Sequence, residues 1–205
     1  MNGIAQTHIN SRSFLAALAA AFVVFVWQGI SHMALPWFHD SLNKFENEAA
    51  MVEAFKANSK VDGIYHLPQA DMKDEAATKA AMKQMETGVS VFVAVKLNGR
   101  GGMAQSLVHQ FIYNLLGALF VTFLLTKLSH SGTGCRVGVT VFFALFAIVT
   151  AILPNWSWWA FSNSFTGFMV FDHLVGWTLA GFVLAKLVPK NDEDETGEEN
   201  LAETN

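Results

Sequence analysis

The sequence predicts a mainly α-helical membrane protein: four transmembrane helices, with a small α/β extracytoplasmic domain inserted between helices 1 and 2. Its 205 residues are 52% hydrophobic and only 15% charged, whereas a soluble domain carries about a quarter charged residues. Four stretches contain no Asp, Glu, Lys or Arg: 13–39, 101–126, 137–171 and 173–185. About 20 apolar residues cross the core of a bilayer, so these stretches accommodate four spans.

The first expected span covers residues 14–30 and follows a short cytoplasmic N-terminus, residues 1–13. Its apolar run is longer than the core of a signal peptide and ends without a small-residue cleavage site, which favours an uncleaved anchor over a cleaved signal. Ala17 and Ala21 lie four residues apart. They offer a small-residue surface on which another helix can pack closely.

The other three spans are expected at residues 105–126, 137–153 and 165–187. Pro154 is expected to end the third span, and the Trp-rich residues 155–159 to form a tight interfacial loop, since tryptophan favours the membrane interface. The fourth span could begin earlier, near Ala160. Its glycines are expected at close helix contacts: Gly167, Gly176 and Gly181.

Short-loop charges predict the orientation. Positive residues flank the loop between the second and third spans and follow the fourth span, at Lys127, Arg136, Lys186 and Lys190. The Trp-rich loop has no positive residue, so the positive-inside rule places both termini in the cytoplasm and residues 31–103 outside. Residues 188–205 are expected to form an acidic, disordered cytoplasmic tail.

The extracytoplasmic segment, residues 31–103, alternates helical and strand patterns. Helices are expected at 47–59 and at 71–86, the second capped by Asp71, with strands at 63–67 and 89–96. This order suggests a small α/β module with two parallel strands joined by the second helix. About 70 residues is near the lower limit for an independent core, so the module is expected to rest on the bilayer, the helical bundle or a partner.

Several function classes are disfavoured. The net charge of −4 and pI near 5.9 leave no basic surface of the kind that binds nucleic acid. The single Cys135 cannot form CxxC zinc or CxxCH haem sites within the chain. The sequence also lacks the Walker loop, GxGxxG, HExxH and GxSxG motifs, so the favoured hypothesis is non-enzymatic.

Polar residues within the spans carry the only indication of chemistry, because ionisable groups in lipid usually face a bundle interior. The candidate metal ligands, at similar depth, are His32, His109, Asp172 and His173. Their side chains suit zinc, copper or iron, and paired histidines could hold haem. They could also relay protons or bind a quinone. The alternative is an interhelical hydrogen-bond network without a ligand, to which a structural polar cluster would belong: Gln28, Tyr113 and Asn114.

The first 70 residues also carry a recognisable pattern: Trp27-x4-His32-x3-Pro36-Trp37-Phe38-His39, then an acidic and alanine-rich helix and Gly63-Ile-Tyr-x-Leu-Pro68. In this it resembles uncharacterised bacterial four-span membrane proteins with a domain of unknown function. The resemblance implies a location in the bacterial cell membrane and supplies no activity or site residues.

The leading hypothesis is therefore a non-enzymatic accessory or scaffold subunit of a bacterial inner-membrane assembly. Its partners would be the lipid bilayer and either another membrane protein or further copies of the chain. The first alternative is a protein that handles a metal, a haem or a quinone through the Asp/His cluster. The second alternative is transport of protons or a small solute.

Overall fold

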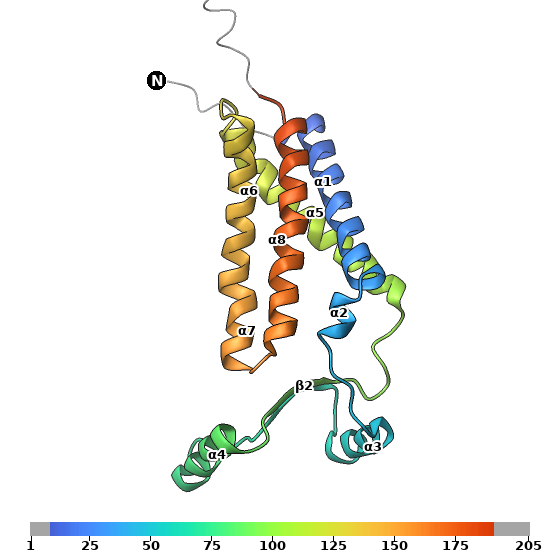
Figure 1. The fold of residues 1–205 in the computed structure, drawn as a ribbon, viewed down its shortest axis with the longest axis vertical. Coiled ribbons are helices and arrows are strands. Elements are labelled where there is room, and N and C mark those ends of the chain that lie inside the picture. The colour runs from blue at the N-terminus through green and yellow to red at the C-terminus, as the bar shows by residue number, and fades with distance from the viewer. Residues whose placement is uncertain (1–8, 191–205) are drawn as a thin grey trace, which may run out of the picture. The chain divides into compact units, whose positions relative to one another are not determined.

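The computed structural model describes residues 9–190 (Figure 1). Within this range, four helices are long and apolar enough to cross a membrane: Ser11–Ala34, Met103–Lys127, Thr133–Trp158 and Asn163–Leu187. The expected number of spans is confirmed as far as the length and composition of the helices are concerned. The acidic residues of the predicted cytoplasmic tail and the first eight residues of the predicted N-terminal segment lie outside the described range.

The first long helix consists of two segments. The α-helix α1, Ser11–Gly29, is capped by Asn10, whose side chain accepts a hydrogen bond from the Ser13 amide at 2.8 Å. It continues as the π-helical turn η1, Ile30–Ala34, in which Leu35 N donates to Ile30 O across five residues. The helix α2, Trp37–Asp40, follows directly.

The third long helix corrects the expectation that Pro154 ends the span. The segments α6 (Thr133–Ala147), η2 (Ile148–Ile152) and α7 (Leu153–Trp158) follow one another without a break. Pro154 lies inside this continuous helix, two residues after the π-helical turn η2, and does not end it. The Trp-rich residues are therefore largely helical, not a loop.

The second and fourth long helices are α5, Met103–Lys127, and α8, Asn163–Leu187. Both contain the expected spans, residues 105–126 and 165–187, completely. The earlier start of the fourth span near Ala160 is wrong, because Ala160 has a φ of 54° and Ser162 caps the helix by accepting from the Phe165 amide.

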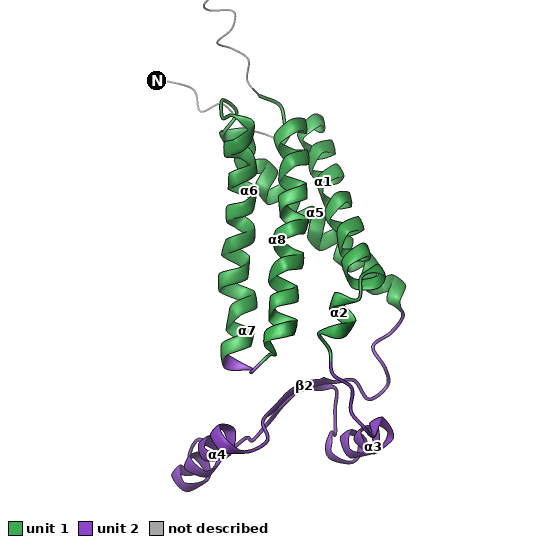
Figure 2. Cartoon of the chain, viewed as in Figure 1, with its two compact units in different colours: residues 1–42, 103–157, 161–205 green, residues 43–102, 158–160 purple. Residues whose placement is uncertain are grey.

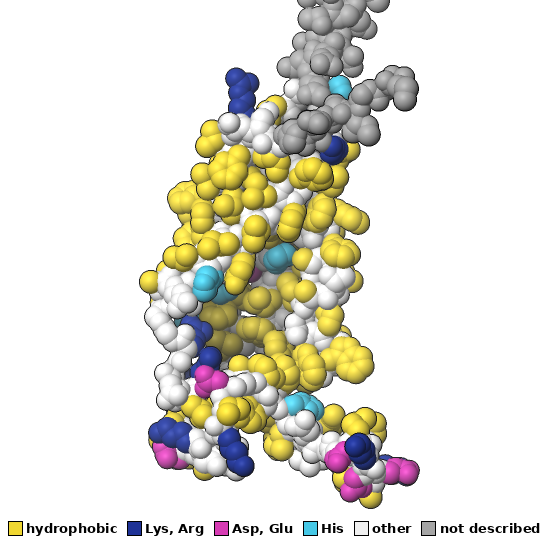
Figure 3. Space-filling view, turned by 180° about the vertical axis from the view of Figure 1, so that it is seen from behind, with side chains coloured by type: hydrophobic (Ala, Val, Ile, Leu, Met, Phe, Trp, Pro, Cys, Tyr) yellow, Lys and Arg dark blue, Asp and Glu magenta, His cyan; other side chains and the backbone are white. Residues whose placement is uncertain are grey.

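The long helices pack through small residues. α1 contacts both α5 and α8, and α6 contacts α8. Alanines dominate the buried core: Ala16, Ala17, Ala20, Ala21, Ala118 and Ala180. Small side chains let helix backbones approach closely, so the expected role of Ala17 and Ala21 is confirmed. Large apolar side chains instead cover the outer surface, and Figure 3 shows them over one face of the helices.

Three glycines lie where a larger side chain would collide with a neighbouring helix. A Cβ atom at Gly117 would lie 2.5 Å from the Trp177 ring, one at Gly176 3.0 Å from Trp27, and one at Gly181 3.1 Å from Thr140. The expected packing roles of Gly176 and Gly181 are confirmed. Gly167 has open space around it, so its expected packing role is wrong.

The chain divides into two compact units (Figure 2). Unit 1 comprises residues 1–42, 103–157 and 161–205, and unit 2 comprises residues 43–102 and 158–160. The elements of unit 2 are α3 (Glu48–Asn58), β1 (Gly63–Leu67), α4 (Glu75–Thr87) and β2 (Val91–Val95). Both helices and both strands of the expected module are present.

The strands of unit 2 correct the expected parallel arrangement. β1 pairs antiparallel with β2, in a register that runs from Gly63 opposite Val95 to Leu67 opposite Val91. A crossover helix in a parallel unit covers the sheet with an apolar face, whereas α4 buries none of its residues. It also begins four residues later than expected, with Asp74 rather than Asp71 as its cap.

Candidate functional site

Asp172 is the centre of the polar contacts between α1 and α8. It is only 5% exposed, although it lies in the middle of an apolar helix. The Ser31 hydroxyl donates a hydrogen bond to its Oδ1 atom, and Trp27 Nε1 donates to its backbone carbonyl at 3.0 Å. Gly176, one turn further along α8, leaves the space that the Trp27 ring occupies. The carboxyl group is thus bound to the adjoining helix.

His32 extends this contact into a chain of three side chains. Its Nδ1 atom lies 3.0 Å from Ser31 Oγ and 3.1 Å from the carbonyl oxygen of Gln28. The Gln28 carbonyl can only accept, so Nδ1 of His32 carries a proton. The Ser31 hydroxyl has two acceptors within reach, Asp172 Oδ1 and, at 3.3 Å, the Gln28 carbonyl; when it donates to Asp172, its oxygen accepts from His32 Nδ1–H. The order of donation is then His32, Ser31, Asp172. Ser31 and His32 both belong to η1, and π-helical turns occur frequently at functional sites.

A second set of hydrogen bonds joins α1 to α5. Gln28 Oε1 accepts from Asn114 Nδ2 at 2.8 Å and from Gln110 Nε2 at 3.2 Å. Gln110 also donates to Asn114 Oδ1 at 3.1 Å. The structure therefore brings together Gln28 and Asn114 of the predicted polar cluster and adds Gln110. Tyr113 is 61% exposed and stacks on His109 instead.

The four predicted metal ligands have different neighbours. Ser31 links His32 to Asp172, whereas the ring of His173 lies 6.2 Å from that of Trp177 and the ring of His109 lies 6.3 Å from that of Tyr113. Over residues 9–190, no three His, Cys, Asp or Glu side chains are grouped so that they could share a metal ion. The metal and haem hypotheses stay predictions, and the described residues offer no group of three ligands that supports them.

An open cleft of about 430 Å³ lies in unit 1 beside this polar contact. The residues around it are Trp37, Asp40, Ser41, Ser164, Phe168 and Phe171. Trp37 and Phe171 meet at 5.4 Å with an angle of 80° between their rings. The centre of the Phe168 ring lies 5.1 Å from that of His32 and 5.4 Å from that of Phe38, and the His32 and Phe38 rings are 4.7 Å apart. This cleft was not predicted from the sequence, in which the one signal for it is an acid close to several aromatic residues in 36–40.

Arg136 makes a further polar contact that was not predicted from the sequence. It is fully buried, and its Nη1 atom donates to Ala185 O at 3.1 Å and to Val188 O at 2.9 Å. The last carbonyl groups of a helix lack partners within the helix, so α6 caps the C-terminal end of α8. Among residues 9–190, Arg136 Nε and Nη2 have no hydrogen-bond partner.

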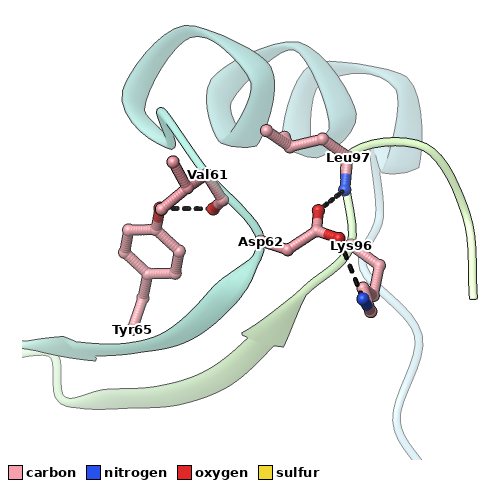
Figure 4. A network of polar contacts seen from close by, with 5 residues as sticks. All are labelled: Val61, Asp62, Tyr65, Lys96 and Leu97. Atoms are coloured by element: carbon pink, nitrogen blue, oxygen red, sulfur yellow. Dashed lines mark hydrogen bonds and ion pairs between the residues drawn. The ribbon is translucent and has the colours of Figure 1, made fainter.

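Unit 2 contains an exposed polar clasp at the end of its sheet (Figure 4). Asp62 accepts from Lys96 Nζ at 2.8 Å and from the Leu97 amide at 2.9 Å. The Lys96 hydrogen bond, followed by that of Leu97, holds the pKa of Asp62 below its usual value. Tyr65 closes the adjoining turn by donating to Val61 O at 2.7 Å. The clasp joins the start of β1 to the end of β2.

Comparisons of the chain with protein-family models, curated proteins and solved structures give no match.

Proposed function

We propose that the chain is a multipass membrane protein that serves as an accessory or scaffold subunit of a bacterial inner-membrane assembly. Residues 43–102 are its extracytoplasmic docking segment, and both termini are cytoplasmic. The observation that carries the docking role is the near absence of a core in unit 2. A segment of this kind gains its stability from what it contacts.

The surface of the four long helices supports the membrane part of the proposal. Large apolar side chains are exposed on every one of them, among them Phe22, Phe120, Phe142 and Phe182. Exposed apolar patches of this extent on a soluble protein lead to association or aggregation. Within the bundle, small residues and interhelical hydrogen bonds make the contacts, which is the usual way in which membrane helices associate. Alkaline carbonate washing tests insertion, because an inserted chain stays in the pellet.

The composition of the surface of unit 2 supports the docking role. Between residues 43 and 102, only Ser59, Pro68 and Val95 are buried. Apolar side chains along β1 and in the loops beside the sheet are at least half exposed: Val61, Ile64, Leu67, Met72 and Val89. A two-stranded sheet alone is marginally stable in water. A protein partner that covers these side chains would supply the missing apolar contacts.

Site-specific crosslinking in native membranes tests the docking role. A photoreactive amino acid at Ile64 is expected to give a discrete adduct with one protein, since this side chain is 62% exposed on β1. The same amino acid at Lys83, on the polar surface of α4, is the matched control. If neither position gives an adduct and the chain purifies as a monomer without another protein, the scaffold proposal is wrong.

A second candidate function, proton exchange with the buried Asp172, is favoured by its hydrogen-bond chain to His32. When His32 carries protons on both ring nitrogens, its Nδ1 proton can pass to Ser31 Oγ while the Ser31 proton passes to the Asp172 carboxylate. This step leaves neutral His32, an unchanged serine hydroxyl and a protonated Asp172.

Proton flux into liposomes that contain the purified chain and a pH-sensitive dye tests this candidate. Asp172→Asn and Ser31→Ala are expected to abolish the flux. His109→Gln is expected to leave it unchanged, because His109 contacts Tyr113 and takes no part in the hydrogen bonds between His32, Ser31 and Asp172. Absence of flux in the unmodified protein, or equal flux in all variants, would contradict proton exchange.

A further inference from the structure

We propose that the cleft between α2 and α8 binds an ammonium group. Asp40 supplies the negative charge, and Trp37 and Phe171 supply aromatic rings. Two sources offer this chemistry: the ethanolamine headgroup of a phospholipid and a free organic amine. The lipid source rests on the proposed membrane location, whereas binding of a free amine does not.

The charge of the cleft selects a cation. Asp40 is the only charged residue among those that line the cleft. Within residues 9–190 it makes no ion pair, because the three pairs present there involve Glu53, Glu75 and Asp62. An anion would face an uncompensated carboxylate, and a neutral apolar ligand would remove that carboxylate from water without a partner. An ammonium group satisfies both requirements.

The aromatic rings provide the second part of an ammonium site. Trp37 is 48% exposed and Phe171 is 42% exposed, so both rings lie on the surface of the protein. The two rings meet edge to face at 5.4 Å, and the ring of Trp27, on α1, lies 6.2 Å from that of Phe171. The faces of aromatic rings attract cations, and such rings beside an acid are a known means of recognising ammonium groups.

The local structure places the carboxylate and the tryptophan together. Trp37 and Asp40 are three residues apart on α2, and side chains at this spacing are neighbours on a helix. The Ser41 hydroxyl donates to Phe38 O at 2.6 Å. Its proton is therefore used, and its oxygen remains free to accept an N–H group from a primary ammonium ion. This favours a primary amine over a quaternary one.

Two measurements on the full-length protein separate the sources. Saturation-transfer NMR titration with ethylammonium, in a non-ionic detergent, measures binding of the free amine. Native mass spectrometry of protein released from bilayers with equal amounts of phosphatidylethanolamine and phosphatidylglycerol measures the retained lipid. Asp40→Asn and Trp37→Leu remove the charge and the ring. Glu86→Gln is the control, since it neutralises an exposed acid of α4 that is no part of the cleft.

Wild type is expected to bind ethylammonium, to retain phosphatidylethanolamine preferentially, or both. Asp40→Asn is expected to weaken whichever binding occurs about tenfold and Trp37→Leu about fivefold, while Glu86→Gln matches wild type. Lipid retention without amine binding identifies the headgroup as the ligand, and the reverse identifies a free amine. The proposal is overturned if wild type shows neither, or if Asp40→Asn, with an unchanged helical circular dichroism spectrum, binds as wild type does. Carbonate washing decides the membrane proposal separately.

Discussion

Adding one methyl group at Gly117 tests the contact between α5 and α8. In Gly117→Ala the new Cβ atom would lie 2.5 Å from Cη2 and 2.8 Å from Cζ2 of Trp177. Carbon atoms in favourable contact are about 3.5–4.0 Å apart. The overlap is therefore about 1 Å, and either the indole ring or the helix has to move.

The expected loss follows from two opposing effects. Overpacking of a well-packed contact costs about 1–3 kcal/mol, while replacing glycine by alanine within a helix gains about 0.5–1 kcal/mol. Gly138→Ala in α6 is a matched control, because a Cβ atom there has open space around it. It receives only the gain. Gly117→Ala is therefore expected to be less stable than Gly138→Ala by about 1–3 kcal/mol.

The free energy of unfolding is measured by titrating the purified protein in mixed micelles with a denaturing detergent, followed by far-ultraviolet circular dichroism. The same substitution in a Trp177→Phe background isolates the collision, because the smaller ring removes the atoms that the methyl group meets. The reasoning is refuted if Gly117→Ala is as stable as Gly138→Ala, or if the Trp177→Phe background leaves its penalty unchanged.

Three further substitutions test other contacts. Asn114→Leu is expected to weaken the association of α1 with α5 by about 0.6 kcal/mol for each hydrogen bond lost, including that to Gln28, measured by the same unfolding titration. Arg136→Ala is expected to cost about 2 kcal/mol in that assay, because two buried carbonyl groups at the end of α8 lose their donor. The pKa of Asp62 is lowered by its contacts with Lys96 and Leu97. The charged carboxylate therefore stabilises unit 2 fully above pH 3.8, and this stabilisation is lost as the pH falls further. The protection factor of the Leu97 amide against hydrogen exchange, which corrects for the intrinsic pH dependence of exchange, measures this loss, and Asp62→Asn is expected to remove its dependence on pH.

The four long helices could be predicted because charge is excluded from long apolar stretches, and this pattern is visible without knowledge of neighbours. The relative direction of the two strands could not be predicted, since the alternation of residues in β1 and β2 is the same for parallel and antiparallel pairing. Pro154 shows another limit. A proline in a sequence usually predicts the end of a helix. Pro154 instead lies inside a continuous helix, two residues after the π-helical turn η2, and a π-helical turn is not visible in the sequence.

The candidate site was predicted in part for a related reason. Asp172 could be singled out because an acid in an apolar span requires a partner. Its actual partner, Ser31, could not be predicted, because a serine is common in apolar helices and nothing in its sequence context marks it as the partner of an acid. Gly117 was missed as well, because its importance depends on Trp177 of another helix. Local patterns identify groups that need partners, but only the packing of helices decides which partners they have.

Labelling of single cysteines with a membrane-impermeant maleimide tests the membrane arrangement most directly. Cys135, at the start of α6, is the only cysteine in the sequence and is exposed. In right-side-out vesicles, a Lys83→Cys substitution in unit 2, made in a Cys135→Ser background, is expected to be labelled at once. Native Cys135 is expected to be labelled only after permeabilisation. Immediate labelling of Cys135 with protection of position 83 would contradict the arrangement of four spans with residues 43–102 outside.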